Sequence, residues 1–506
     1  MPSLLPEGTL PRIVRRRDPK VLPQLDHLVA ILPAGAPKSA WSGVPGGAAL
    51  GAAARRRGVG KADTLLTLHL ETPCPVTVGF ADREGSPFRW LALGRKLAAE
   101  ALAGRPGRLG IMTCGAPEAD ARQWLDATVS AVLAAIAPMP KFKSGDAARE
   151  SRLTTITLLD EAVVPDANRL LAAAEGNHLA RWLAALPPNR LDARGYRGVL
   201  EELAAREGWG MEFLDETALE ERGAGAFLAV ARGNPHRDAG IAHIRYRPEH
   251  SRAAKAKLAF VGKGICFDTG GTNLKPFRSM LDMHEDMLGS AVALGTLVAL
   301  TRVGYPEPVD CWLAITENHI GSNAYKSRDI VTAANGTTIE VIHTDAEGRM
   351  VLADTLALAG REQPELIVDF ATLTGACVAA LTDRYSGVFS NRDEVAQLAV
   401  AAGRTSGERV WAFPMDADFD EALESSNADV QQCSVDNDGD HILAARFLQR
   451  FVPSDIAWLH IDLAAGHRKG GLAHVATPQT GFGVRLTLAM LLDHGLASRA
   501  RDRQRP

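Results

Sequence analysis

The sequence KLAFVGKGICFDTGGTNLKP, residues 257–276, begins as a short apolar run and continues into a turn rich in glycine. An apolar run of this length, bounded by glycine, predicts a buried strand at residues 257–261. Lys263, Asp268 and Lys275 follow in the turn. In open α/β sheets functional groups gather beyond the carboxyl ends of the strands, so we expect this turn to form part of a site.

Two further predicted strands end in unusual sequences. The strand TIEVI, residues 338–342, leads into His343 and then into TDAEGR, which opens a predicted helix. The strand LIVDF, residues 366–370, leads into ATLTG, residues 371–375. Strand ends on one edge of a sheet lie close together, so we expect these three turns to converge.

Acidic residues in these turns suggest a metal site. Asp345 and Glu347 are two residues apart, and in locally extended backbone this spacing points both carboxylates the same way. Two like charges side by side need a counter-charge, since otherwise a proton is forced onto one of them. Asp268 and Asp286 are expected as third and fourth ligands. Such a carboxylate-rich set suits Zn²⁺ or Mn²⁺, or Mg²⁺ if it is loosely held.

Other interpretations of these motifs stay open at this point. A DxE sequence at a helix start is often only a cap that complements the helix dipole. A GKG sequence after a strand can be an anion-binding turn. The pattern GxxxxGK[ST] does not occur in the sequence, so a P-loop NTPase is not supported. Spacing alone therefore suggests a metal site without deciding its chemistry.

The rest of the chain alternates predicted strands and helices, which is the pattern of an α/β protein. Strands are also predicted at residues 27–32, 64–70, 75–80, 108–113, 154–159, 226–231, 241–246 and 309–315. Helices are predicted at residues 90–102, 118–135, 166–186, 193–207, 290–302 and 348–359. Residues 39–61 are predicted to be a mobile loop, because their glycines disfavour a continuous helix.

The chain length and its prolines predict two unequal domains. Pro187 and Pro188 end the predicted helix before them. We expect an N-terminal α/β domain at residues 1–163, a linking helix at 164–186, a catalytic domain at 187–495 and a basic tail at 496–506. The larger domain should hold a central mostly parallel or mixed sheet with helices on both faces.

Composition narrows the classes of function. Of the 506 residues, 46% are hydrophobic and 23% charged, as in soluble globular proteins, and the net charge of -4 creates no general attraction for nucleic acid. The basic runs at residues 15–17 and 55–57 are short. Six widely spaced cysteines predict reduced thiols. Since neither a signal peptide nor an 18-residue apolar stretch is found, we expect a cytoplasmic protein that does not enter a membrane.

The segments at residues 261–276, 343–359 and 371–381 closely resemble the signature sequences of the leucyl aminopeptidases, the cytosol aminopeptidase family of dinuclear zinc exopeptidases. The resemblance continues through residues 317–331, 384–391 and 458–466, and it covers roughly residues 186–490. It implies a metal-dependent aminopeptidase that acts on peptides with a free α-amine. Family members are typically hexamers, so a homo-oligomer is expected.

The resemblance also assigns roles to individual residues. It implies that two divalent ions, Zn²⁺ or Mn²⁺, are held by Lys263, Asp268, Asp286, Asp345 and Glu347, with Asp268 and Glu347 bridging them and Lys263 as a neutral amine. A water activated by both metals would attack the peptide carbonyl. Lys275 would stabilise the oxyanion, and Arg349 would hold a bicarbonate ion that carries protons. Met283, Thr372 and Gly375 match positions of a pocket that favours Leu or Met.

The sequence departs from the family pattern at a few places. His343 stands where the family usually has Asn, and we expect it to be packed rather than to bind a metal. Residues 325–329 lack the usual Pro-Gly, residues 433–441 are unusually acidic, and Ala465 stands near a turn that commonly contains glycine. Alternatives to aminopeptidase activity are a carboxypeptidase or amidase reaction at the same metals, or a DNA-binding architectural role supported only by the basic runs.

Overall fold

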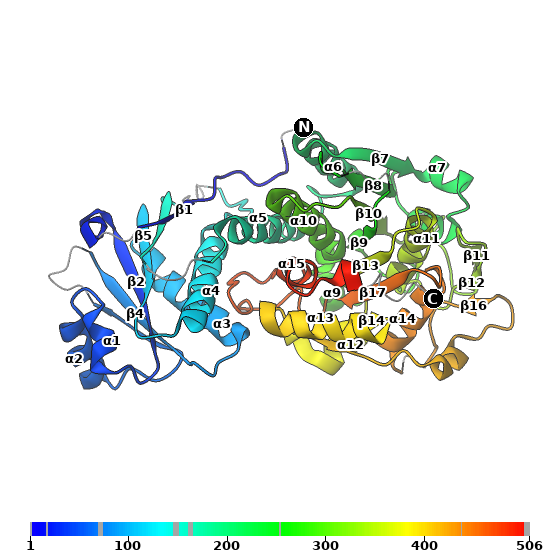
Figure 1. Ribbon diagram of the computed structural model, residues 1–506. Coiled ribbons are helices and arrows are strands. Elements are labelled where there is room, and N and C mark those ends of the chain that lie inside the picture. The colour runs from blue at the N-terminus through cyan, green and yellow to red at the C-terminus, as the bar shows by residue number, and fades with distance from the viewer. Residues whose placement is uncertain are drawn as a thin grey trace.

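The computed structural model describes residues 3–16, 19–68, 74–144, 151–159, 165–251, 253, 255–436 and 438–499. Two mixed β-sheets with helices on their faces lie side by side (Figure 1). The predicted α/β class is therefore confirmed. The strands of the smaller sheet lie between residues 12 and 158, and those of the larger sheet lie between residues 210 and 462. The domain boundaries expected from the sequence stay a prediction.

The smaller sheet belongs to the N-terminal part of the chain. Its strand order is β1-β6-β5-β2-β4-β3, and every pairing is parallel except that of β3 with β4. The strands are β1 (Arg12–Arg15), β2 (His27–Pro33), β3 (Thr64–Leu68), β4 (Val76–Ala81), β5 (Arg108–Thr113) and β6 (Thr155–Leu158). The helices are η1 (Pro19–Gln24), α1 (Lys38–Ser42), α2 (Gly47–Arg57), α3 (Pro87–Leu102) and α4 (Glu118–Ile136). Helices α3 and α4 pack against each other beside this sheet.

The larger sheet has the order β15-β14-β17-β13-β9-β10-β8-β7, and its central strands β17, β13, β9 and β10 are parallel. The strands are β7 (Gly210–Asp215), β8 (Gly240–Tyr246), β9 (Leu258–Asp268), β10 (Val309–Asn318), β13 (Leu366–Ala371), β14 (Ser386–Ser390), β15 (Val410–Ala412) and β17 (Ala457–Asp462). Parallel strands put their carboxyl ends on one edge, so β9, β10 and β13 deliver the turns that follow them to the same place.

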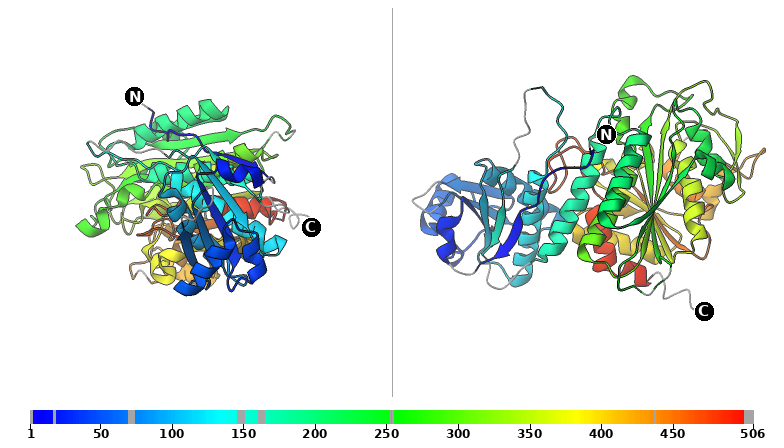
Figure 2. Two further views of the ribbon diagram at one scale, coloured as in Figure 1. Left: turned by 90° about the vertical axis from the view of Figure 1, so that its left-hand side faces the viewer. Right: turned by 90° about the horizontal axis from the view of Figure 1, so that it is seen from above.

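Helices cover both faces of the larger sheet (Figure 2). Along β9, Leu258 and Phe260 enter one core while Ala259 and Val261 enter the other, because side chains alternate along a strand. The first core contains residues of α5 (Ala167–Ala184), α6 (Ala193–Glu207), α10 (Leu288–Val303), α13 (Asp393–Ser406) and α15 (Val484–Leu492). The second contains residues of α7 (Glu216–Glu221), α8 (Gly225–Ala231), α11 (Glu347–Arg361) and α14 (Asp440–Gln449). The remaining short helices are α9 (Phe277–Met280), η2 (Met283–Glu285), α12 (Gly375–Leu381), η3 (Thr382–Arg384), η4 (Ala417–Leu423) and α16 (Leu496–Arg499).

The two sheets are connected through shared packing. Helix α5 packs closely along α10 and also contacts α4. Residues of the segment after β17, including Leu472, Val475 and Phe482, enter the core of the smaller sheet's helices. The N-terminal part of the molecule therefore helps to hold a loop that begins beside the strand ends of the larger sheet.

Two sequence predictions about local structure are wrong. Residues 226–231 were expected to form a strand, but they lie in α8, whose residue Phe227 donates its backbone N–H to Asp354 at 2.7 Å. A short, wholly apolar run has no visible period, so the sequence could not separate a helix from a strand here. Residues 39–61 were expected to form a loop, but they contain α1 and α2. Gly51 lets α2 approach the ring of Trp41, since an added Cβ would lie 3.2 Å from it. Tertiary packing thus outweighs the low helix propensity of glycine.

The strand expected at residues 338–342 lies outside the larger sheet. It is β12 (Thr338–Glu340), which pairs with β11 (Ile330–Thr332) and β16 (Val430–Gln431) in a separate three-stranded sheet. The expectation that it shares a sheet with the other two strand ends is wrong. The following turn nevertheless leads to α11, which packs across β9, β10 and β13.

The cysteines and the most apolar helix fit a packed interior. All six cysteines are free thiols, as predicted, and all but Cys114 are buried. Among the described residues, one helical stretch, Phe277–Val303, is long and apolar enough to cross a membrane. Its apolar window is 83% buried inside the structure, which is the burial of a core helix. The basic tail predicted at 496–506 lies mainly outside the described residues, which end at 499.

Glu408 predicts a pH dependence of stability. Its Oε2 accepts the backbone N–H groups of Gly483 at 2.8 Å and Leu486 at 2.9 Å, which caps α15, and burial raises the pKa of Glu408 to about 7. A raised folded-state pKa stabilises the fold below the unfolded pKa of about 4.3, and this contribution is lost as the pH rises through about 7. We expect Glu408→Gln to gain stability relative to wild type between pH 5 and 8, on the order of 1–3 kcal/mol.

Urea unfolding at several pH values measures this difference. The exposed Glu84 provides the control Glu84→Gln, whose stability should track that of wild type at every pH. A stability difference between Glu408→Gln and wild type that does not change with pH would contradict the assignment.

Candidate metal centre

Lys263 lies within β9 and not, as predicted, in a turn after the strand, and a glycine of β9 and a glycine of α11 lie close to it. An added Cβ at Gly262 would lie 2.5 Å from the Cα of Ser290 on α10, and one at Gly348 would lie 2.7 Å from Lys263 Nζ. Because these glycines carry no side chain, α10 and α11 both approach β9 closely. The Lys263 side chain consequently lies against the first turn of α11, where Glu347 is located.

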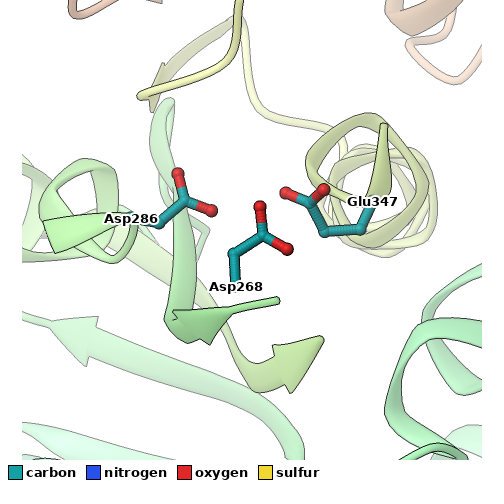
Figure 3. A group of neighbouring side chains, drawn as sticks. All are labelled: Asp268, Asp286 and Glu347. Carbon is teal, nitrogen blue, oxygen red and sulfur yellow. The ribbon is translucent and has the colours of Figure 1, made fainter. Parts of the chain in front are cut away.

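Three buried carboxylates point toward one another at this strand end (Figure 3). Asp268 ends β9, Asp286 follows η2, and Glu347 begins α11. One carboxylate oxygen from each lies within 4.8 Å of the others. The structure thus brings together three of the residues that the sequence predicted as ligands, although they are up to 79 positions apart, from 268 to 347.

Two lysines are inserted among these carboxylates. Lys263 Nζ lies 2.8 Å from Asp286 Oδ2 and 2.8 Å from Glu347 Oε1, and it donates to the Thr372 carbonyl oxygen at 3.0 Å. Lys275 Nζ lies 2.8 Å from Asp268 Oδ2 and also pairs with Asp345. The site therefore contains four carboxylates and two amines, which are the five predicted ligands and Lys275.

The electrostatics of the cluster show an excess of negative charge. Burial and the neighbouring Asp268 and Glu347 together raise the pKa of Asp345 to about 7, against the effect of Lys275. Burial also raises the pKa of Asp286 well above its usual range, and Lys263 only partly opposes this. Burial lowers the pKa of Lys263, but the adjacent carboxylates outweigh it and the pKa lies above its ordinary value.

The donor set fits divalent cations. Glu347 Oε2 is buried and has no hydrogen-bond partner among the described residues, so it is free to bind a ligand. Clustered carboxylates with one amine nitrogen suit Zn²⁺ or Mn²⁺ better than Mg²⁺, which prefers oxygen ligands and waters. Binding of such a cation near Lys263 would favour its neutral amine, because the cation repels the ammonium proton.

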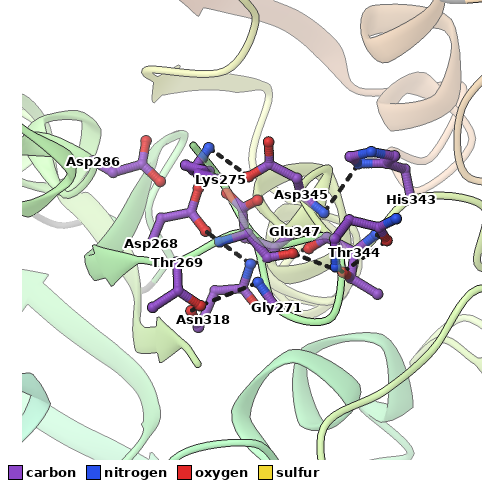
Figure 4. Close-up of polar contacts among 12 residues, drawn as sticks. Asp268, Thr269, Gly271, Lys275, Asp286, Asn318, His343, Thr344, Asp345 and Glu347 are labelled. Atoms are coloured by element: carbon purple, nitrogen blue, oxygen red, sulfur yellow. Dashed lines mark hydrogen bonds and ion pairs between the residues drawn. The ribbon is translucent and has the colours of Figure 1, made fainter. Parts of the chain in front are cut away.

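A network that the sequence analysis did not assign holds Asp268 in place (Figure 4). Asp268 Oδ1 accepts hydrogen bonds from Gly270 N–H and from Asn318 Nδ2, both at 2.8 Å. Asn318 Nδ2 also donates to the Thr344 carbonyl at 3.0 Å, and Tyr325 Oη donates to the same carbonyl at 2.7 Å. Asn318 ends β10, whose carboxyl end lies on the same edge of the larger sheet as those of β9 and β13, and inspection of every predicted strand end would have found it.

Asp286 is oriented by a second set of contacts. Thr372 Oγ1 donates to Asp286 Oδ1 at 2.8 Å. The preceding residue, Glu285, is buried and pairs with His467 Nδ1 and with Gln479 Nε2, both at 2.7 Å. His467 and Gln479 belong to the loop that packs on the N-terminal part of the molecule, so that part supports the candidate ligand Asp286 indirectly.

Some site residues differ from their sequence predictions. Asp345 lies in a turn and not in extended backbone, and the residue after it has φ of -110° and ψ of 39°. His343 was expected to be packed, but the residue is exposed to solvent on one side, and its Nδ1 accepts the N–H of Asp345 at 3.3 Å. Partial desolvation of the ring and the nearby Lys275 lower the pKa of His343. Two of the residues predicted to line a pocket, Met283 and Gly375, lie at the start of η2 and of α12, respectively.

Arg349 also has a partner that the sequence did not predict. Its Nη2 donates to both carboxylate oxygens of Asp440, at 2.7 and 2.8 Å, and its Nη1 donates to the Gln432 carbonyl at 3.1 Å. The family resemblance instead implies an exogenous bicarbonate ion on this guanidinium. The acidic character of residues 433–441 was the available signal for Asp440.

Comparisons with known proteins agree on one family. The model of the cytosol aminopeptidase family, catalytic domain, matches residues 178–488. A protein named probable cytosol aminopeptidase from Wolbachia pipientis wMel is 40% identical over 355 residues, covering 68% of this chain and 70% of the relative. A solved structure of a tomato leucine aminopeptidase mutant matches with a TM-score of 0.84 and 26% identity, covering 97% of this chain and 98% of the other.

A further solved structure provides a comparison with bound metal. It is the bottromycin maturation enzyme BotP in complex with Mn, which matches with a TM-score of 0.79 and 29% identity over 94% of this chain and 99% of the other. Both solved structures span nearly the full chain, so the likeness includes the smaller sheet as well as the larger one.

Asn318 provides a test of the candidate centre. We expect Asn318→Ala to weaken metal binding about 10- to 100-fold, because Asp268 loses a hydrogen bond that orients it. Titration of the metal-free protein with Mn²⁺ in a calorimeter measures the dissociation constant. Asn335→Ala, at an exposed residue near the end of β11, is the matched control and should bind Mn²⁺ as wild type does. Equal affinity for Asn318→Ala and wild type would show that the hydrogen bond has no role in the centre.

Proposed function

This chain belongs to the cytosol aminopeptidase family of metallo-exopeptidases, and on that premise we propose that it removes the N-terminal residue from peptides with a free α-amine by means of two divalent metal ions. The proposed ligands are Lys263, Asp268, Asp286, Asp345 and Glu347. The observation that carries this proposal is the buried cluster of Asp268, Asp286 and Glu347, whose carboxylate oxygens lie within 4.8 Å of one another. The Mn complex of the related BotP structure supports a divalent metal of this kind.

The metal ions and Asp286 have different tasks in this proposal. When bound, the metal ions supply an acidified water and polarise the carbonyl of the scissile bond. Asp286 is fixed by Thr372 and offers a carboxylate to the substrate's α-ammonium group. An acylated amine carries no charge and would lose this contact. The preference for exopeptidase cleavage follows from that difference.

Lys275 has the properties of a group that stabilises an oxyanion. Burial lowers the pKa of Lys275, but Asp268 and Glu347 outweigh it, so the pKa lies above its ordinary value and the amine stays charged. Asp268 and Asp345, which now pair with Lys275, would hold it less tightly if they also served as metal ligands. The ammonium group would then be available to the carbonyl oxygen as negative charge develops there.

The proposal extends to substrate and setting. Met283, Thr372 and Gly375 are proposed to line the pocket for the first side chain, with a preference for Leu or Met. Space for that side chain exists beside Gly375, because an added Cβ there would meet no atom within 4 Å. The names of the relatives support a cytoplasmic location, and a homo-oligomer, expected to be a hexamer, remains part of the proposal.

The DNA-binding alternative gains no specific support from the described residues. The basic run Arg55–Arg57 forms the last turn of α2. Positive side chains are favoured at that end of a helix by its dipole, so a local structural role accounts for them. The metal cluster, in contrast, has no structural explanation of this kind, since it places four acidic groups in a buried space.

The reaction is tested with leucine p-nitroanilide and its N-acetyl analogue. We expect the Mn²⁺-loaded protein to hydrolyse the free-amine substrate at least 100-fold faster, because only that substrate has a charged amine that can pair with Asp286. Release of p-nitroaniline measures both rates. Equal turnover of the two substrates would falsify the aminopeptidase proposal and favour an amidase. Activity that survives exhaustive metal removal would contradict the role of the metals.

Two substitutions should separate metal binding from transition-state stabilisation. Lys275→Met should retain metal, since it removes a competing cation, and should lower kcat by about 100-fold or more. Glu347→Gln should lose both metal and activity, since it removes a charged ligand. Elemental analysis of the purified variants, together with kcat, measures both properties. Loss of metal from Lys275→Met would assign that lysine to the ligand set instead.

A further inference from the structure

Arg349 is a buried cation whose hydrogen bonds are directed to its own chain. Only 2% of the residue is exposed. Nη2 donates to Oδ1 and Oδ2 of Asp440 at 2.7 and 2.8 Å, and Nη1 donates to the Gln432 carbonyl at 3.1 Å. Burial lowers the pKa of Arg349, but Asp440 outweighs this effect and the pKa lies above its ordinary value. The ion pair is therefore a stable part of the fold.

The pair lies next to the candidate metal centre. Arg349 is two residues after Glu347 in the first turn of α11. The charges of Glu347, Asp440 and Arg349 all act on the ring of His343, which precedes Asp345 by two positions. Asp440 retains 15% exposure of its side chain, whereas Arg349 is enclosed. The carboxylate is thus the more accessible partner of the pair, and Arg349 ties it to the first turn of α11, which also carries Glu347.

A bicarbonate ion on Arg349 does not fit this arrangement. A planar anion binds a guanidinium through two adjacent donor nitrogens, and here Nη2 already holds a carboxylate while Nη1 holds a carbonyl. Nε is buried and has no partner among the described residues, but each pair of adjacent nitrogens that could hold a planar anion includes Nη2, which Asp440 occupies. An added anion would have to displace Asp440 and would leave that carboxylate unpaired beside it. Like charges so close in a buried place are strongly unfavourable. The expected cofactor and the residues of this chain therefore disagree.

We propose that Asp440 takes the place of an exogenous bicarbonate. The anion that pairs with Arg349 is then part of the chain itself, and none is needed from solution. This inference rests on the proposed function for its catalytic part. Asp440 would accept the proton from water as the water oxygen forms its bond to the carbonyl carbon and the π electrons move to the carbonyl oxygen. It would return that proton to the amide nitrogen as the C–N bond breaks and its electron pair stays on nitrogen. The carboxylate is regenerated at the end.

The test compares three variants with wild type. Asp440→Ala vacates the guanidinium and opens a space for a small anion. Asp440→Asn keeps an acceptor on Arg349 but removes the negative charge. Asp420→Ala is the matched control, because Asp420 pairs with Nε and Nη2 of Arg446, at 2.8 and 2.7 Å, on the same helix α14 but outside the proposed centre. Each protein is measured with sodium bicarbonate and with sodium chloride at equal ionic strength.

The first readout is binding, which does not depend on activity. We expect Asp440→Ala to lower the Tm of the metal-free protein by several degrees, because a buried charge loses its partner. Bicarbonate should restore much of the lost Tm in Asp440→Ala. The ¹³C signal of labelled bicarbonate should broaden when this variant is added. Wild type, Asp440→Asn and Asp420→Ala should show neither effect. A bicarbonate-dependent Tm rise in wild type as large as that in Asp440→Ala would overturn the proposal, as would the absence of binding to Asp440→Ala.

The second readout is kcat of the Mn²⁺-loaded enzymes on leucine p-nitroanilide. We expect wild-type kcat to be unchanged by bicarbonate and Asp440→Ala to lose about 100-fold or more. Bicarbonate should restore kcat in Asp440→Ala in a saturable way but not in Asp440→Asn, whose amide still occupies Arg349. Binding without recovery of kcat would overturn the proton-carrying role. Discrimination against the N-acetyl substrate tests the aminopeptidase reaction separately, so the two failures are distinguishable.

Discussion

The repulsion among four carboxylates in a buried space is the constraint on which the site depends. Asp268, Asp286, Asp345 and Glu347 face only two ammonium groups, those of Lys263 and Lys275, which leaves two negative charges in excess. At short range and low dielectric such repulsion is worth several kcal/mol per pair. Together with burial, which is the larger cause, this repulsion raises the pKa values of Asp286 and Asp345. A divalent cation removes the excess, and the two lysines hold the cluster together without it.

The scaffold resists this repulsion by holding Asp268 and Asp286 with hydrogen bonds from neighbouring residues. Asn318 and the N–H of Gly270 hold Asp268, and Thr372 holds Asp286, so neither group can swing away from its neighbours. The carbonyl of Thr344, beside Asp345, is held by both Asn318 and Tyr325. These supports come from rigid strand ends and the turns next to them, which favours the accurate placement that metal ligation requires. The strand order of the larger sheet, with β9 between β13 and β10, makes the convergence possible.

The sequence predicted the α/β class, most elements of both sheets and the approach of the acidic residues to one another, because each of these leaves a local pattern. Periodicity marks α6 and β5, and polar residues after apolar runs mark the strand ends. Prediction from the sequence failed where tertiary packing decides which local structure forms. The run Gly225–Ala231 forms a buried helix, and Gly51 allows α2 to pack closely against the ring of Trp41. Asn318 and Asp440 lie 50 and 91 positions from their partners Asp268 and Arg349, and no motif connects them.

The ion pair of Arg349 with Asp440 gives an electrostatic reason for one departure from the family pattern, the acidic character of residues 433–441. A buried guanidinium needs an anion, and either the solvent or the chain can provide it. Asp440 is the first residue of α14, so its carboxylate is stabilised by the positive end of that helix as well as by Arg349. A tethered group of this kind has a high effective concentration, which a dissolved ion at millimolar level cannot match. An acidic residue at position 440 therefore excludes a second anion, and the acidity of residues 433–441 changes the chemistry of the centre without changing any proposed metal ligand.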